Sequence, residues 1–232
     1  MATGMAQAGA DIAVLDVIPE AAEARAKAIA ELGRQAIGIP CDATSKADLQ
    51  KALDTVLQRF GHVDILLNAA GVNSATPFFE IGEAEWHRIL DIDLKSVFLA
   101  CQVFGKAMVD AGRGGSIINI SSVSSSPPLS KVFTYSVAKA GVNQITQFLA
   151  KELAPHNVRV NAIMPGFFPA EQNRKILTED RVASIMGHTP MKRFGESSEL
   201  VGAAVYLASP RAASFVTGSI LRVDGGFTAT TI

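Results

Sequence analysis

A tyrosine and a lysine spaced one helical turn apart have the clearest chemical potential in this chain. Tyr135 and Lys139 lie four residues apart, shortly after the apolar run Ile117 to Ile120. Residues i and i+4 share one face of a helix, so we expect the phenol and the ammonium to lie side by side. A neighbouring cation favours the phenolate and lowers the pKa of a tyrosine from its usual ~10. The pair could therefore move a proton onto or off a substrate oxygen.

A serine adds a third group to this pair. Ser122 follows the run Ile117 to Ile120, whose length and β-branched residues predict a buried strand. Ligands of open α/β sheets bind beyond the carboxyl ends of the strands, so this strand would deliver the hydroxyl to the same place. Alone, a Tyr-x-x-x-Lys spacing is more typical of a half-buried aromatic beside a solvated lysine. The surrounding motifs must decide between the two interpretations.

The elements that would position these residues alternate between strand and helix. We predict strands over 12–15, 36–39, 63–67, 117–120, 159–163 and 219–223, and helices over 1–8, 20–32, 46–60, 83–110 and 196–207, with another helix carrying Tyr135. This alternation predicts an α/β fold with a doubly wound parallel sheet. No internal repeat or linker divides the chain, so we expect one domain over 1–232.

Composition excludes several classes of function. The chain has 21 basic and 22 acidic residues without a basic block, which argues against nucleic acid or a membrane surface as partner. No apolar run is long enough to span a membrane. Cys41 and Cys101 form no disulfide framework and fit a reducing compartment, so we expect a cytoplasmic protein. The four histidines lack metal-ligand spacing, so we expect no metal.

Two further motifs complete a recognisable set. Asn68-Ala69-Ala70-Gly71 follows the third predicted strand, and Pro165-Gly166 follows the fifth. Together with Ser122, Tyr135 and Lys139, they resemble the short-chain dehydrogenase/reductase family over essentially the whole chain. The resemblance implies a Rossmann-like fold and a nicotinamide cofactor. It also implies that Tyr135 donates or accepts the proton, that Lys139 lowers the phenol pKa and holds the nicotinamide ribose, and that Ser122 binds the substrate oxygen.

The same resemblance assigns the cofactor site. Asp16 ends the strand over 12–15, where a carboxylate can accept the ribose hydroxyls of NAD and repel the 2′-phosphate of NADP. No lysine or arginine adjoins it, so we expect NAD, although an aspartate at a strand end can also simply cap a turn. The remaining matches are Asp42 and Ala43 at the adenine, Asn68, Ala69 and Gly71 in the turn, and Pro165, Gly166 and Phe168 at the nicotinamide.

This sequence departs from the family pattern at a fourth catalytic position. The family has an asparagine in its long central helix, whereas Asp93 stands there in this chain. An ionised carboxylate can accept a hydrogen bond from a relay water but cannot donate one. We expect Asp93 to take the place of that asparagine, with asparagine tolerated there and leucine much less active.

A second departure concerns the start of the fold. Dinucleotide folds begin with a strand and a glycine-rich turn that holds the pyrophosphate at a helix N-terminus. Here Thr3-Gly4 lies within the first predicted helix, and no strand precedes it. We therefore expect the first strand and glycine-rich loop to be absent from these residues. A working enzyme would need roughly 20 more before Met1, and an in-frame stop codon immediately upstream would contradict this.

The segment after Pro165-Gly166 sets substrate choice in the family. Here it resembles the branch that interconverts D-mannonate and D-fructuronate, and Gln172, Asn173 and Arg174 would supply two amides and a forked cation for a carboxylate. A polar lid with a merely solvated arginine is the competing interpretation. A 3-oxoacyl-carrier-protein reductase, a polyol dehydrogenase and a cofactor-poor member without activity also fit the motifs. The family usually forms tetramers, so we expect a homotetramer.

Overall fold

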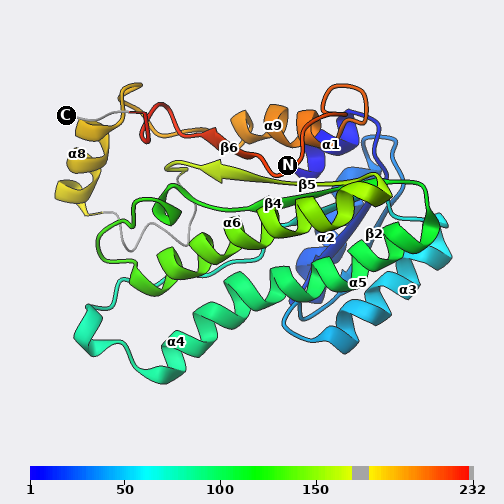
Figure 1. Ribbon diagram of the computed structural model, residues 1–232, viewed down its shortest axis with the longest axis horizontal. Helices are drawn as coiled ribbons and strands as arrows, with labels where there is room; N and C mark the ends of the chain where they lie inside the picture. The colour runs from blue at the N-terminus through cyan, green and yellow to red at the C-terminus, as the bar shows by residue number, and fades with distance from the viewer. Residues whose placement is uncertain (169–177, 230–232) are drawn as a thin grey trace.

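Strands and helices alternate along the chain as predicted (Figure 1). The computed structural model describes residues 1–168 and 178–229. Its strands are β1 (Ile12–Asp16), β2 (Ala36–Pro40), β3 (Ile65–Asn68), β4 (Gly115–Ile120), β5 (Val158–Pro165) and β6 (Ile220–Val223). Its helices are α1 (Ala2–Gln7), α2 (Pro19–Ala30), α3 (Lys46–Phe60), α4 (Glu83–Leu90), α5 (Ser96–Ala111), α6 (Phe133–Leu153), α8 (Glu179–His188) and α9 (Glu199–Ala208).

All paired strands run parallel, which confirms the predicted Rossmann-like α/β fold. β1 pairs with β2, and a second sheet has the order β3-β4-β5-β6. Parallel neighbours require crossover connections, which the intervening helices supply. The carboxyl ends of the paired strands therefore lie at one edge of each sheet, where the sequence places its polar motifs.

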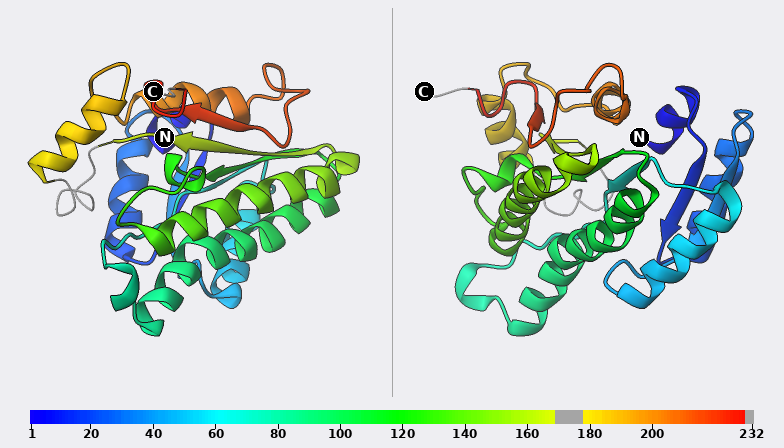
Figure 2. Two further views of the ribbon diagram at one scale, coloured as in Figure 1. Left: turned by 60° about the vertical axis from the view of Figure 1, so that its left-hand side comes forward. Right: turned by 45° about the vertical axis from the view of Figure 1, so that its right-hand side comes forward.

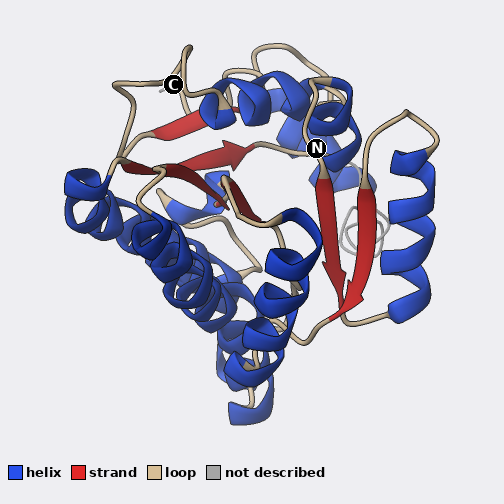
Figure 3. Cartoon of the chain, turned by 90° about the vertical axis from the view of Figure 1, so that its right-hand side faces the viewer, coloured by secondary structure: helices blue, strands red, loops and turns tan. Residues whose placement is uncertain are grey.

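The two sheets lie beside each other with β1 and β3 on the facing edges (Figure 3). Within the described part of the chain, neither strand has a hydrogen-bonded partner on that edge. A cavity of about 710 Å³ separates them, lined by residues 12–15 of β1 and residues 65–68 of β3. The parallel strands are thus divided into two sheets by this cavity.

Helices cover both faces of the larger sheet (Figures 1 and 2). Successive side chains of a strand point to opposite faces. Ile117 accordingly packs on the side of α5 and α6, in a cluster with Met108 and Val142. Ile118 packs on the other side, in a cluster with Met5 of α1 and Leu207 of α9. Both isoleucines are fully buried, so β4 lies between the two halves of the core.

The helix predicted over 83–110 is interrupted. It divides into α4, a π-helical turn over Asp91–Lys95, and α5. A π-turn inserts one extra residue into the helical repeat, and such turns frequently occur at functional sites. Asp93 lies in this turn and is fully buried, although a regular amphipathic helix rarely buries a carboxylate. In the described part of the chain, no helix is both long and apolar enough to cross a membrane.

One glycine permits the close packing of α2 on β2. A Cβ atom at Gly38 would lie 2.6 Å from the backbone carbon of Ala22. We predict that Gly38→Ala lowers the free energy of unfolding by ~1–3 kcal/mol, because the helix backbone must move away. In α9, a Cβ atom at Gly202 would meet no other atom within 4 Å, so Gly202→Ala is the matched control and should be neutral or stabilising by up to ~1 kcal/mol. Urea denaturation measures both, and equal effects would contradict the packing argument.

Candidate active site

Tyr135 and Lys139 lie on one face of α6, as their spacing predicts. The Lys139 ammonium nitrogen is 5.4 Å from the centre of the Tyr135 ring. Lys139 is buried, with 3% of its surface exposed, and it donates a hydrogen bond to the carbonyl oxygen of Ile120 (3.1 Å). That carbonyl ends β4, so the lysine ties the helix to the carboxyl end of the central strand.

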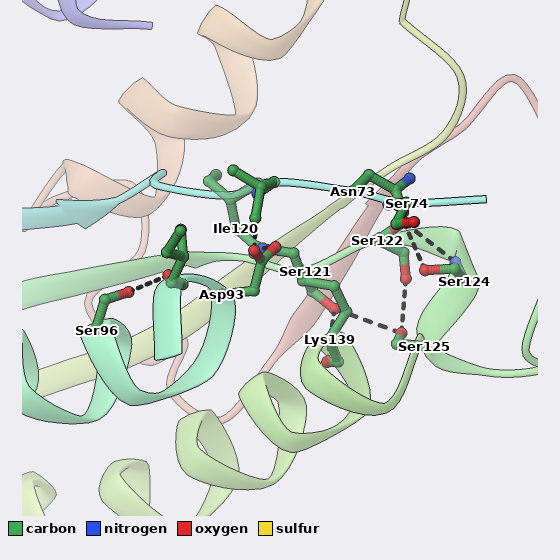
Figure 4. A network of polar contacts seen from close by, with 12 residues as sticks. Asn73, Ser74, Asp93, Ser96, Ile120, Ser121, Ser122, Ser124, Ser125 and Lys139 are labelled. Carbon is green, nitrogen blue, oxygen red and sulfur yellow. Dashed lines mark hydrogen bonds and ion pairs between the residues drawn. The ribbon is translucent and has the colours of Figure 1, made fainter. Parts of the chain in front are cut away.

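Ser122 lies beside Tyr135 at the end of β4 and forms a hydrogen bond with the phenol. Its hydroxyl also accepts hydrogen bonds from the backbone N–H (3.2 Å) and the hydroxyl (3.1 Å) of Ser124 (Figure 4). The preceding Ser121 is buried and contacts the backbone carbonyl of Lys139 instead. Both serines line the pocket described next, but Ser121 also connects the strand to α6, while Ser122 holds the turn that follows β4.

A pocket of about 250 Å³ opens beside these groups. Ser122 and Tyr135 form part of its wall, and residues 165–168 lie against the same space. Its other polar lining includes Asn73 and Arg181. Hydroxyl groups that can bind a substrate oxygen and the segment expected at the nicotinamide therefore line the same pocket.

Asp93 makes a direct ion pair with Lys139. One carboxylate oxygen, Oδ2, is 3.3 Å from the lysine Nζ, and both side chains are almost completely buried. The other, Oδ1, accepts a hydrogen bond from the backbone N–H of Val72 (2.7 Å). A Cβ atom at Gly71 would lie 2.9 Å from Oδ2, so a larger residue there would crowd the ion pair. Burial raises the pKa of Asp93 and lowers the pKa of Lys139.

The predicted decrease in the pKa of Tyr135 is wrong for this structure. Burial raises the pKa of the phenol to about 12, the hydrogen bond with Ser122 lowers it, and the charge of Asp93 raises it further. The main reason is burial of the phenol, which the spacing of Tyr135 and Lys139 does not reveal. The structure also places the Asp93 carboxylate against the Lys139 cation.

The candidate residues for the adenine half of a dinucleotide lie at the ends of β1 and β2. Asp16 accepts a hydrogen bond from the backbone N–H of Ile18 (2.9 Å), and Asp42 accepts one from the N–H of Thr44 (2.8 Å). Both carboxylates thus cap local turns, which is compatible with a second, ligand-binding role because each has further acceptor positions. Ala43 lines the cavity between the two sheets.

Asn68 has a structural partner that the sequence did not reveal. Its side-chain amide donates to the Asn119 side chain on β4 (2.9 Å), and Asn119 donates to the Thr146 hydroxyl on α6 (2.9 Å). This chain of hydrogen bonds satisfies amides inside the core and fixes β3 against β4. Asn68 and Ala69 also line the cavity between the sheets, and Gly71 follows beside Asp93.

The residues expected at the nicotinamide are placed close to the candidate catalytic group. Pro165 ends β5, and Gly166 continues its pairing through a hydrogen bond to the carbonyl of Val223 (2.9 Å). Phe168 lines the pocket that also contains Ser122 and Tyr135. The carboxylate of Asp16, the small residues after β3 and this apolar segment are compatible with the two ends of a nicotinamide dinucleotide, whereas no glycine-rich turn for its pyrophosphate occurs among the described residues. The described residues contain no cluster able to hold a metal ion.

The predicted substrate residues Gln172, Asn173 and Arg174 lie outside the described residues. The structure instead brings Asn73 and Arg181 to the pocket, and neither residue was predicted from the sequence. The sequence does contain a signal for the start of the helix that carries Arg181. Thr178 caps the N-terminus of α8 by accepting a hydrogen bond from the Arg181 N–H (3.4 Å), and acidic residues follow the cap, as is typical of a helix start.

Comparisons with known proteins agree with this geometry. A short-chain dehydrogenase family model described as enoyl-(acyl carrier protein) reductase matches residues 1–228. The chain belongs to the short-chain dehydrogenase/reductase family. It is 36% identical over 228 residues to 5-keto-D-gluconate 5-reductase of Escherichia coli strain K12, covering 97% of this chain and 89% of that protein. This enzyme family acts on CH–OH groups with NAD or NADP.

Solved structures of family members superimpose closely. A gluconate 5-dehydrogenase from Burkholderia cenocepacia, in complex with NADP and tartrate, has a TM-score of 0.94 and 33% identity, over 99% of this chain and 90% of that one. A candidate D-mannonate oxidoreductase from Haemophilus influenzae, with bound NAD, has a TM-score of 0.93 and 35% identity, also over 99% and 90%. The fold is therefore shared nearly throughout.

The ion pair makes a prediction about pH. The resemblance implies that the Tyr135 phenolate would be the base in the oxidation direction, and the Asp93 charge opposes formation of that phenolate. Asp93→Asn keeps an acceptor for Val72 but removes the charge, so the pKa of Tyr135 should fall. The pKa of Lys139 should fall as well, because Asp93 stabilises the ammonium. Both changes move the pH profile of kcat/KM toward acid, by about one unit.

The matched control is Asp91→Asn, in the same π-turn. Asp91 is half exposed and pairs with Lys95 at 3.4 Å, so its charge is screened by solvent and its loss should leave the profile unchanged. Profiles measured with NAD for both variants and the parent protein test the argument. An Asp93→Asn profile identical to that of the parent would show that the phenol does not sense this charge.

Proposed function

We propose that this protein is an NAD-dependent oxidoreductase that interconverts a hydroxyl and a ketone of an open-chain sugar acid, with D-mannonate and D-fructuronate as the substrate pair. Relatives named for keto-gluconate, gluconate and D-mannonate support a sugar acid. The tartrate in one of those structures is itself a hydroxy acid, which supports the same class.

The size and lining of the pocket carry this proposal. Its volume of about 250 Å³ is below the ~300–1,000 Å³ of sites for drug-sized ligands, so it favours a compact substrate over a long acyl chain. Its lining is mostly apolar, but it also carries hydroxyls, the Asn73 amide and the Arg181 guanidinium, which can bind the hydroxyls and the carboxylate of a small sugar acid. A long 3-oxoacyl chain would need a longer channel than this volume provides.

The roles of the residues follow from their positions. Ser122 and the phenol of Tyr135 would bind the reacting oxygen, and Tyr135 would donate its proton to a ketone or remove it from an alcohol. Lys139, held by Asp93 and the Ile120 carbonyl, would keep a positive charge beside the phenol. NAD, when bound, supplies the hydride chemistry. Asp16, Asp42, Ala43, Asn68, Ala69, Gly71 and the segment Pro165, Gly166 and Phe168 would hold it.

Asp16 supports NAD rather than NADP. It ends β1, and the residues that follow, Val17 and Ile18, are exposed and uncharged. A 2′-phosphate placed there would meet a carboxylate without a cation to neutralise it. The carboxylate can instead accept hydrogen bonds from two ribose hydroxyls.

We also propose a homotetramer. Two aromatic residues on the outer faces of α5 and α6 support it: Phe98 is 46% exposed and Phe148 is 64% exposed. Exposed apolar residues on neighbouring helices are typical of a surface that another subunit covers. Light scattering of the purified protein should give four times the chain mass of 24.4 kDa, and a monomer mass at micromolar concentration would reject the proposal.

Steady-state kinetics test the substrate and the cofactor together. We expect kcat/KM for D-mannonate with NAD to exceed that for D-mannitol with NAD, because the two molecules differ only in the carboxylate. We also expect NAD to be preferred to NADP. Oxidation of mannitol at an equal or higher rate would favour a polyol dehydrogenase, and absence of turnover together with absence of NADH binding by calorimetry would favour a protein without activity.

A further inference from the structure

An arginine that the family resemblance did not assign lies in the wall of the active-site pocket. Arg181 comes from the first turn of α8 and lines the same space as Ser122, Tyr135 and Asn73. It is the only charged side chain among the described residues of that lining. The catalytic hydroxyls and this cation therefore reach one pocket from different elements, β4 and α6 on one hand and α8 on the other.

The guanidinium of Arg181 is positioned without being neutralised. It donates to the backbone carbonyl of Ser130 (3.1 Å) and, at the limit of hydrogen bonding, to the Ser130 hydroxyl (3.5 Å). These contacts use two of its five N–H donors. They orient the side chain toward the loop before α6 and leave three donors available.

Two other arginines, unlike Arg181, are neutralised by a carboxylate. Arg34 pairs with Asp11 at 2.8 Å, and Arg193 pairs with Glu199 at 2.6 Å. Within the described residues, no carboxylate lies within ion-pair distance of Arg181. A half-buried guanidinium with spare donors that lines a small, mostly apolar pocket is suited to bind an anion, and its fork matches the two oxygens of a carboxylate.

We propose that Arg181 binds the carboxylate of the sugar-acid substrate while Ser122 and Tyr135 engage its reacting oxygen. This inference rests on the proposed function and names the group that recognises the acid. Two anchors at separate points of one pocket fix both the position and the direction of an extended chain, which holds the reacting carbon in place. A neutral polyol of the same length lacks the second anchor.

Calorimetric binding of D-mannonate and D-mannitol, with and without NAD, tests the proposal on the protein as it exists. In Arg181→Gln, the dissociation constant for D-mannonate should rise about ten- to a hundredfold, because a charge-assisted hydrogen-bonded pair is lost. The constant for D-mannitol should change less than about twofold. Arg181→Lys should lie between, because an ammonium keeps the charge but not the bidentate fork.

Two further variants complete the experiment. Arg113→Gln removes an exposed arginine outside the pocket and should bind both ligands as the parent protein does. Arg174→Gln tests the other arginine proposed from the sequence. Thermal unfolding confirms that each variant is folded, and Arg181→Lys keeps the test informative if the glutamine variant is not.

The outcomes separate this inference from the proposed function. If the parent protein binds D-mannitol but not D-mannonate, the sugar-acid function fails. If the parent protein binds D-mannonate and Arg181→Gln binds it equally well, the role of Arg181 is overturned. The same conclusion follows if Arg181→Gln weakens both ligands equally, or if Arg174→Gln alone carries the selective loss.

Discussion

The buried ion pair between Asp93 and Lys139 is the constraint on which the candidate site depends. Two opposite charges lie 3.3 Å apart in the protein interior, and each is stable there only because the other is present. Removing one partner of such a pair typically costs ~3–5 kcal/mol, since the other charge is left buried and unpaired. The surrounding backbone has to supply the remaining hydrogen bonds, which fixes the geometry of three separate segments.

Those segments explain several features that otherwise look unrelated. The π-turn over Asp91–Lys95 turns Asp93 into the core. The turn after β3 brings the Val72 N–H to one carboxylate oxygen, and Gly71 leaves room for the other. The end of β4 offers the Ile120 carbonyl to Lys139. Tyr135 is carried by the same helix as Lys139, so the position of the phenol follows from the position of the pair.

Sequence patterns predicted the parts of this arrangement that depend on local periodicity. Apolar runs such as Ile117 to Ile120 marked the strands, and the spacing of Tyr135 and Lys139 placed both on one helical face. The π-turn could not be predicted, because one inserted residue barely changes the pattern of an apolar helix. The partners of Asn68 were also hidden, because its hydrogen bonds join residues 51 positions apart.

The wrong prediction for the pKa of Tyr135 is the most informative difference between sequence and structure, because this pKa governs proton transfer. A lysine beside a tyrosine predicts an acidic phenol only when no anion compensates the lysine. Here burial is the main cause that raises the pKa of Tyr135 to about 12, and the charge of Asp93, which pairs with Lys139, contributes to the increase. Burial and the Asp93 charge both oppose ionisation of the phenol, so the π-turn that places Asp93 in the core also acts on the group expected to transfer the proton.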